Sequence, residues 1–258
     1  MSTKLDRSAS IREAIPPVGL GTWPLKGDTA YRIVLQALEM GYRHLDTATY
    51  YGNEEQIGRA LRSSGLRRDE VFITTKMPQG NAGRERATIE ESLQALQVDA
   101  VDLWLVHWPP AGKSAPDTWA EFLRARDDGL ARFVGVSNYD VSQLDELTAA
   151  HKEAPALNQI RYGPSLHSQL LLTEHERRGI VVAGWSPFKS TNLAHPVLVR
   201  IADNHGMSAA QVVVRWHIQH GVICLPRSTN VGRLRSNRDV DGLVLTPEQI
   251  TAIDKLAD

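Results

Sequence analysis

The sequence has one cysteine, no long apolar run and no excess of charge, and each shortage excludes a class of protein. Only Cys224 of the 258 residues carries a thiol, which excludes an intrachain disulfide framework and favours a reducing compartment. No segment approaches the roughly 20 apolar residues of a membrane span, and the polar N-terminal segment lacks an apolar signal core. The formal net charge of -1 gives no general attraction to nucleic acid or membrane surfaces. We therefore expect a cytoplasmic monomer without nucleic-acid or membrane partners.

The sequence also lacks the glycine-rich turn of a doubly wound nucleotide-binding sheet. That turn reads Gly-x-Gly-x-x-Gly after the first strand, whereas here Gly19 and Gly21 are followed by Pro24 where the third glycine would stand. The chain instead alternates β-rich runs with segments that repeat apolar residues every three to four positions, as amphipathic helices do. The β-rich runs predict eight strands, at residues 18–22, 42–46, 71–76, 101–107, 131–137, 156–160, 180–186 and 221–226.

Strict alternation of strand and helix predicts a parallel sheet covered by helices. Eight such units in 258 residues predict an α/β fold of the (β/α)8 TIM-barrel type, with a single domain over residues 1–258. Residues 9–17 are expected to form a small β-hairpin that closes the barrel floor. An extra C-terminal helix is expected over residues 245–256, because Thr246 is a suitable cap and Pro247 suits the first helical position.

Polar side chains stand at the C-terminal ends of the predicted strands, where TIM barrels carry their chemistry. Asp46, Lys76 and His107 end the second, third and fourth strands, and Tyr51 lies on the loop after the second. Each has an ordinary structural explanation when it is considered alone, as a helix cap, a solvated lysine or a core histidine. Their coincidence at one barrel mouth favours a functional site.

These four side chains make chemical sense as an acid–base set. A tyrosine hydroxyl has a pKa of about 10 and is a poor proton donor at neutral pH, unless a neighbouring ammonium such as that of Lys76 lowers this pKa. Asp46 can supply the counter-charge that keeps a desolvated lysine protonated, and His107 can orient a substrate oxygen. The set can exchange a proton with an oxygen without a nucleophile or a metal cage.

Seven sequence segments resemble the successive signatures of the aldo-keto reductase family, and particularly those of its short bacterial diketogulonate and aldehyde reductases. They cover nearly the whole chain in order and read DTATYYGNEEQIGRAL, ITTK, LWLVHWP, GVSN, NQI, GWSP and LPRSTNVGRLRSN. The resemblance implies a catalytic tetrad of Asp46, Tyr51, Lys76 and His107, in which Tyr51 rather than Tyr50 donates the proton. It also implies a nicotinamide dinucleotide bound across the barrel mouth without a Rossmann fold, and no metal.

Other polar residues at the strand ends suit such a cofactor. Amide and hydroxyl groups can hold a carboxamide, and an indole face can stack on a nicotinamide ring. The arginine-rich segment after the last strand suits a phosphate, so we expect NADPH to be preferred and NADH to bind more weakly. Arg227 stands where the family usually has lysine, which keeps the positive charge but changes the geometry of a phosphate contact. The expected contacts are Thr22, Trp23, Ser137, Asn138, Gln159, Trp185, Ser186, Phe188, Arg227, Ser228, Thr229, Asn230, Arg233 and Asn237.

The expected function is NADPH-dependent reduction of aldehydes and ketones to alcohols by hydride transfer, with Tyr51 protonating the carbonyl oxygen. Small or apolar carbonyl compounds and dicarbonyls are the expected substrates, because the pocket offers aromatic and apolar groups without an obvious charged anchor. The loop after the fourth predicted strand is short, and the sequence ends soon after the last predicted helix. We therefore expect the substrate pocket to be open to solvent. The expected pocket residues are Trp23, Tyr50, Met77 and Trp108, together with Phe188 and Leu193.

Three other functions compete with carbonyl reduction. A catalytically silent protein of this fold could bind NADPH as a sensor or regulatory subunit. A metal-dependent hydrolase would need a His-x-His pair on the first strand, and His44 with Asp46 and His107 is a thin substitute. A glycosidase would need two opposed carboxylates in the mouth, whereas Glu54 and Glu55 stand in the first turn of a predicted helix. The complete tetrad favours the reductase.

Overall fold

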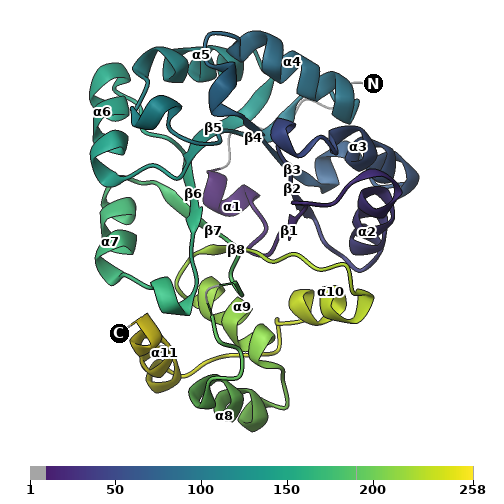
Figure 1. Cartoon of the computed structure of the whole chain (residues 1–258), viewed down its shortest axis with the longest axis vertical. Helices are drawn as coiled ribbons and strands as arrows, with labels where there is room; N and C mark the ends of the chain where they lie inside the picture. Colours follow the sequence, from purple (N-terminus) through teal and green to yellow (C-terminus); the bar gives the residue numbers. More distant parts are fainter. Residues whose placement is uncertain (1–9, 190, 258) are drawn as a thin grey trace.

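Eight parallel strands form the centre of the computed structural model, which describes residues 10–189 and 191–257 (Figure 1). They pair in chain order from β1 to β8, and a parallel bridge from Val18 to Cys224 links the last strand to the segment before the first. The expected TIM barrel is therefore confirmed. Its strands are β1 (Leu20–Gly21), β2 (His44–Asp46), β3 (Phe72–Met77), β4 (Val101–Val106), β5 (Ala131–Ser137), β6 (Leu157–Arg161), β7 (Val181–Trp185) and β8 (Ile223–Leu225).

Helices surround the strands, and α8 and α11 lie farther out beyond α9 at one end of the view in Figure 1. None of the helices in the described ranges has the length and apolar character needed to cross a lipid bilayer. The helices are α1 (Ile11–Ala14), α2 (Gly27–Glu39), α3 (Glu54–Ser63), α4 (Glu85–Leu96), α5 (Pro116–Asp127), α6 (Val141–His151), α7 (Gln169–Arg177), α8 (Pro196–His205), α9 (Ala209–Gln219), α10 (Val231–Arg238) and α11 (Pro247–Asp254).

The segment before β1 forms a helical turn, so the expected β-hairpin is wrong for residues 10–17, while residue 9 lies outside the described residues. The carboxylate of Glu13 accepts hydrogen bonds from the backbone N–H and the hydroxyl of Ser10, both at 2.9 Å, which stabilises the first turn of α1. Ile11 and Ile15 are buried against apolar side chains from the strands. Figure 1 places α1 over the centre of the strand ring, where it closes one end of the barrel.

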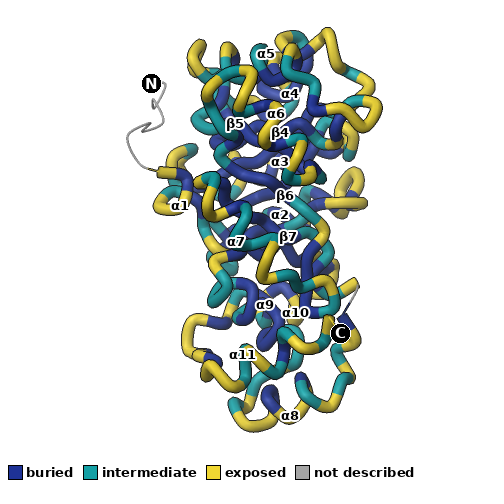
Figure 2. The backbone as a smooth tube through the Cα atoms, turned by 90° about the vertical axis from the view of Figure 1, so that its left-hand side faces the viewer, coloured by how far each residue is buried: buried dark blue, intermediate teal, exposed yellow. Residues whose placement is uncertain are grey.

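Apolar side chains fill both the barrel interior and the layer between strands and helices. Figure 2 shows buried residues concentrated in the middle of the molecule and exposed residues along its edges. All residues of β3 and β4 are buried, and Trp104 of β4 stacks on Phe122 of α5 with ring centroids 3.6 Å apart. The predicted C-terminal helix is confirmed as α11, in which the side chain of Thr246 accepts a hydrogen bond from the backbone N–H of Gln249. This packing holds the strand ends in fixed positions around the barrel mouth.

Candidate active site

Asp46, Tyr51 and Lys76 converge at the C-terminal ends of β2 and β3. The ammonium of Lys76 donates to Oδ1 of Asp46 at 2.6 Å and to the carbonyl oxygen of Thr47 at 2.7 Å, and it lies 3.5 Å from the Tyr51 hydroxyl. Lys76 is fully buried and Asp46 is only 4% exposed. A buried charge is tolerated when it is paired and hydrogen-bonded, and Lys76 meets both conditions.

His107 completes the expected tetrad at the end of β4. Its ring meets the ring of Tyr51 edge to face, with centroids 5.6 Å apart. Its backbone is held by neighbouring strands, because its N–H donates to the carbonyl of Met77 at 3.0 Å and its carbonyl accepts from the Asn138 side chain at 3.0 Å. The structure therefore brings together all four residues that the sequence predicted as catalytic.

The charge state of Lys76 follows from its partners. Burial lowers the pKa of Lys76, but the opposite charge of Asp46 and the contact with Tyr51 outweigh burial, so the pKa lies above its ordinary value. Lys76 is therefore an ammonium at neutral pH. The carboxylate has the counter-charge role that the sequence predicted for it.

Burial decides the protonation of Tyr51 and His107. Burial raises the pKa of Tyr51, and this effect outweighs the lowering by Lys76 that the sequence predicts, so the net pKa lies above the ordinary value. Tyr51 keeps its proton at neutral pH, which is the form that can donate it. Burial, followed by the charge of Lys76, lowers the pKa of His107 to about 3, so its imidazole is neutral and can donate one hydrogen bond.

Gln159 on β6 contributes an interaction that sequence reasoning missed. Its side-chain amide donates to Oδ2 of Asp46 at 2.6 Å. The two carboxylate oxygens of Asp46 are thus bonded to different partners, with Lys76 on Oδ1 and Gln159 on Oδ2. The sequence predicts only a cofactor role for Gln159, because a contact between residues 113 positions apart leaves no local pattern.

The predicted amide and indole groups form a hydrogen-bonded wall beside the tetrad. The Asn138 amide donates to the carbonyl of His107 at 3.0 Å and to the Ser137 hydroxyl at 2.9 Å, and its oxygen accepts from the Trp185 indole at 3.1 Å. Asn138 has a φ of 65°, in the left-handed region that asparagine enters more readily than most residues. These bonds fix the orientation of the Trp185 ring.

A cavity of about 800 Å³ opens at this end of the barrel. Three aromatic side chains stand at its rim, with Trp23 48%, Tyr50 66% and Trp108 46% exposed. Sequence reasoning missed Lys189, which also lines the cavity and follows the GWSP segment closely. The predicted residues that line it are Thr22, Trp23, Asp46, Tyr50, Tyr51, His107, Trp108, Ser137, Asn138, Gln159, Trp185, Ser186, Phe188 and Arg227.

Two predicted pocket residues lie elsewhere, and these assignments are wrong. Met77 is fully buried in the apolar core and is not part of the cavity lining. Successive side chains of a strand point to opposite faces, so Met77 faces the helices because Lys76 faces the barrel interior. Leu193 packs instead against the core cluster that contains residues of α8 and α9.

The predicted phosphate segment follows β8 and runs into α10. Arg227 lines the cavity, while Thr229, Asn230 and Arg233 are exposed near the start of the helix. The Asn230 side chain accepts from the backbone N–H of Arg233 at 3.0 Å and so caps α10. Ser228 and Asn237 are buried, at 8% and 3% exposure.

Comparisons with known proteins agree with the barrel fold. The sequence model of the Aldo/keto reductase family matches residues 17–258. An aldo-keto reductase of Mycobacterium sp. (strain KMS) is 42% identical over 249 residues, which cover 95% of this chain and 90% of the relative. The 2,5-diketo-D-gluconic acid reductase B of Corynebacterium sp. is 40% identical over 243 residues, or 92% and 88% of the two chains. The crystal structure of a Bombyx mori aldo-keto reductase in complex with NADP superposes with a TM-score of 0.87 and 31% identity, covering 94% of this chain and 89% of that one.

Proposed function

Because the chain belongs to the aldo/keto reductase family, we propose that this oxidoreductase uses NADPH to reduce aldehydes and ketones to alcohols. The observation that carries the proposal is a protonated tyrosine hydroxyl beside a buried ammonium at the cavity wall. Tyr51 lies 3.5 Å from the ammonium of Lys76, which is in turn bonded to Asp46. This arrangement supports proton transfer to an oxygen rather than nucleophilic attack.

The cavity fits a nicotinamide ring. Trp185 offers a planar face whose orientation is fixed by the bond to Asn138. The oxygen of the Asn138 side chain has a second lone pair, and Gln159 still offers its carbonyl oxygen after donating to Asp46. These two oxygens would accept the two N–H groups of a carboxamide. When bound, the nicotinamide supplies the hydride.

The residues of the tetrad divide the proton chemistry between them. Tyr51 gives its hydroxyl proton to the carbonyl oxygen as the carbonyl carbon gains the hydride, which completes the alcohol. The ammonium of Lys76 stabilises the phenolate that Tyr51 becomes, and Asp46 keeps that ammonium charged. Neutral His107 donates a hydrogen bond that orients the carbonyl oxygen beside Tyr51.

The rim of the cavity suits small or apolar carbonyl compounds, including dicarbonyls. Trp23 stacks on Tyr50 with ring centroids 5.7 Å apart, and both rings are partly exposed at the mouth. A flat apolar substrate gains burial against these rings at little conformational cost, because aromatic side chains have few rotamers to lose.

Steady-state oxidation of NADPH with a panel of activated aldehydes, ketones and dicarbonyls tests the proposed reaction. We expect carbonyl-dependent turnover with at least one class of these compounds. Tight NADPH binding without turnover on any of them would contradict the proposal and favour a cofactor-sensing role instead.

We expect Arg233→Ala to lower the preference for NADPH over NADH. Arg233 is exposed near the start of α10, where its guanidinium can pair with the phosphomonoester that distinguishes the two cofactors. A lost bond to a charged group costs about 1.5–3 kcal/mol, so the ratio of the two affinities should fall by roughly 10- to 100-fold. Arg235→Ala is the matched control, because Arg235 is exposed on the same helix. An unchanged affinity ratio in Arg233→Ala would show the assignment to be wrong.

A further inference from the structure

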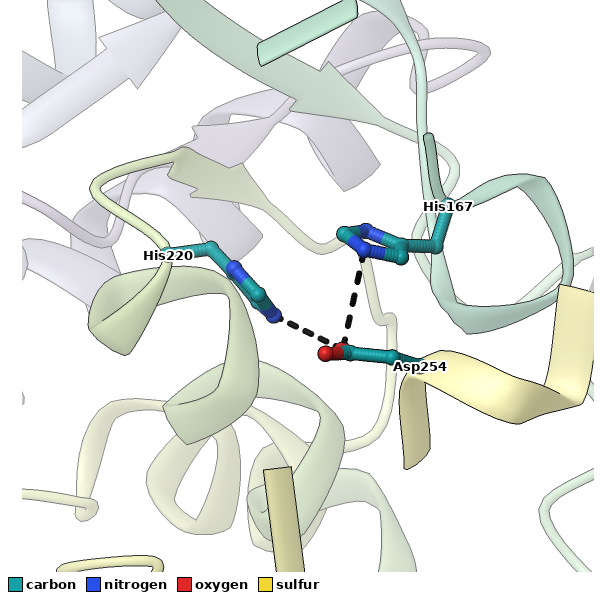
Figure 3. Close-up of side chains that lie close together, drawn as sticks. All are labelled: His167, His220 and Asp254. Carbon is teal, nitrogen blue, oxygen red and sulfur yellow. Dashed lines mark hydrogen bonds and ion pairs between the residues drawn. The ribbon is translucent and has the colours of Figure 1, made fainter. Parts of the chain in front are cut away.

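A second cluster of chemically reactive side chains lies outside the active-site cavity, where three segments of the chain meet (Figure 3). His167 directly follows the short helix η5 (Pro164–Leu166) after β6, and His220 directly follows α9. Asp254 is the last residue of α11. One ligand atom from each residue lies within 4.8 Å of the others. The sequence predicts no metal ligands, so this group is a feature that only the structure reveals.

The three side chains point toward one another from different elements, as Figure 3 shows. Nε2 of His220 lies 2.8 Å from Oδ1 of Asp254, and Nε2 of His167 lies 3.8 Å from the same oxygen. The side chains of His167, His220 and Asp254 are 8%, 12% and 26% exposed. Ligands about 2.0–2.1 Å from a tetrahedral Zn²⁺ are about 3.3 Å apart, a spacing that the two measured separations bracket.

We propose that His167, His220 and Asp254 bind a divalent transition-metal ion, with Zn²⁺ as the favoured ion. Two imidazole nitrogens and one carboxylate oxygen form a ligand set suited to Zn²⁺ and its neighbours in the first transition row. Ca²⁺ and Mg²⁺ are disfavoured because they select oxygen ligands. The ion takes the position of the proton between His220 and Asp254. Small side-chain rotations then bring Nε2 of His167 within bonding distance of the ion.

Two buried aromatic side chains orient these ligands. The Tyr162 hydroxyl lies 2.7 Å from Nδ1 of His167, and the Trp216 indole donates to Oδ1 of Asp254 at 2.7 Å. When Nδ1 of His167 carries the proton and donates it to Tyr162, Nε2 is left as a free lone pair on the side of Asp254. Outer partners of this kind fix the tautomer and ring orientation of metal-bound histidines.

A hydrogen bond that only joins two helices accounts for part of this arrangement. The contact between His220 and Asp254 is enough to join the end of α9 to α11. It gives no reason for a second imidazole nitrogen, that of His167, near the same carboxylate oxygen. The bound ion fastens α11 to α9 and to the segment after β6, which makes its role structural.

Calorimetric titration of Zn²⁺ into the tag-free, chelator-treated full chain tests the site. We expect one Zn²⁺ per chain for the wild type, and loss of this binding in the double variant His167→Ala/His220→Ala. Hydrogen exchange of the α11 amides should slow on addition of Zn²⁺ in the wild type alone. Absence of Zn²⁺ binding in the wild type, or equal binding in the double variant, would overturn the proposal.

Two further variants separate metal binding from general disturbance of α11. His205→Gln is the matched control, because His205 on α8 bonds to Gln249 of α11 at 3.2 Å but lies outside the cluster, and it should bind Zn²⁺ as the wild type does. Tyr162→Phe removes only the outer partner of His167 and should weaken Zn²⁺ binding by about 10- to 100-fold. Unchanged affinity in Tyr162→Phe would also count against the site, even if the double variant did not fold.

Discussion

We expect Tyr51→Phe to lower kcat for carbonyl reduction by about 10²- to 10⁴-fold while leaving NADPH affinity unchanged, because a positioned general acid contributes on that scale. The substitution removes one hydroxyl oxygen and keeps the ring that packs edge to face against His107. Lys76 keeps its bonds to Asp46 and to the carbonyl of Thr47, so the buried ammonium stays paired. The loss therefore falls on proton donation rather than on folding.

Steady-state kinetics and NADPH titration of the two proteins side by side measure this effect. Tyr50→Phe is the matched control, since Tyr50 carries the same hydroxyl one position earlier but is 66% exposed at the rim. We expect this control to change kcat by less than about threefold, in line with a side chain that makes no contact with the developing charge. Similar losses in both variants would show that Tyr51 is not the specific proton donor.

The sequence predicts the proximity of the four candidate catalytic residues because the fold brings them together at one edge. The C-terminal ends of parallel strands share one face of a barrel, so assigning Asp46, Lys76 and His107 to strand ends was enough to predict their proximity. The net pKa of Tyr51 could not be predicted in the same way. It depends on the balance between burial and the ammonium of Lys76, and only the three-dimensional structure reveals the extent of burial.

Two other features were harder to predict, namely which face of a strand a side chain occupies and which residues far apart in the sequence are in contact. The sequence predicts Met77 in the pocket, but its side chain points to the opposite face of β3 from that of Lys76. Alternation along a strand shows which residues share a face, but only the strand register shows which face points to the pocket. The bond from Gln159 to Asp46 joins distant strands and leaves no trace in either local segment. The helical turn α1 did have a signal, because Ser10 and Glu13 have the spacing of a capping box.

Mild acid should destabilise the fold because three histidines are buried as neutral imidazoles. Burial lowers the pKa of His44 to about 4, of His107 to about 3 and of His217 to about 4, from an ordinary value of 6.5. Between these values the unfolded chain binds protons that the folded chain does not, so the free energy of unfolding falls as the pH falls. The stability contribution is complete above pH 6.5 and is progressively lost below it, toward the folded pKa values.

The size of this effect approaches the whole stability of a typical domain. At about 1.4 kcal/mol per pKa unit, lowering the pH from 6.5 to 5 costs about 2 kcal/mol for each histidine and roughly 6 kcal/mol for the three. Folded domains are typically stable by only about 5–15 kcal/mol, so the urea midpoint should fall steeply over this range.

Urea unfolding at about pH 7 and pH 5 measures the predicted loss. Few carboxylates with ordinary pKa values near 4 titrate in this interval, so the histidines should dominate it. His217→Gln removes one of the three and should reduce the loss between the two pH values by about 2 kcal/mol, although it also lowers stability at pH 7 because His217 is bonded to the carbonyl of Val213. Equal unfolding free energies at the two pH values in the wild type would mean that these imidazoles are not held neutral by burial.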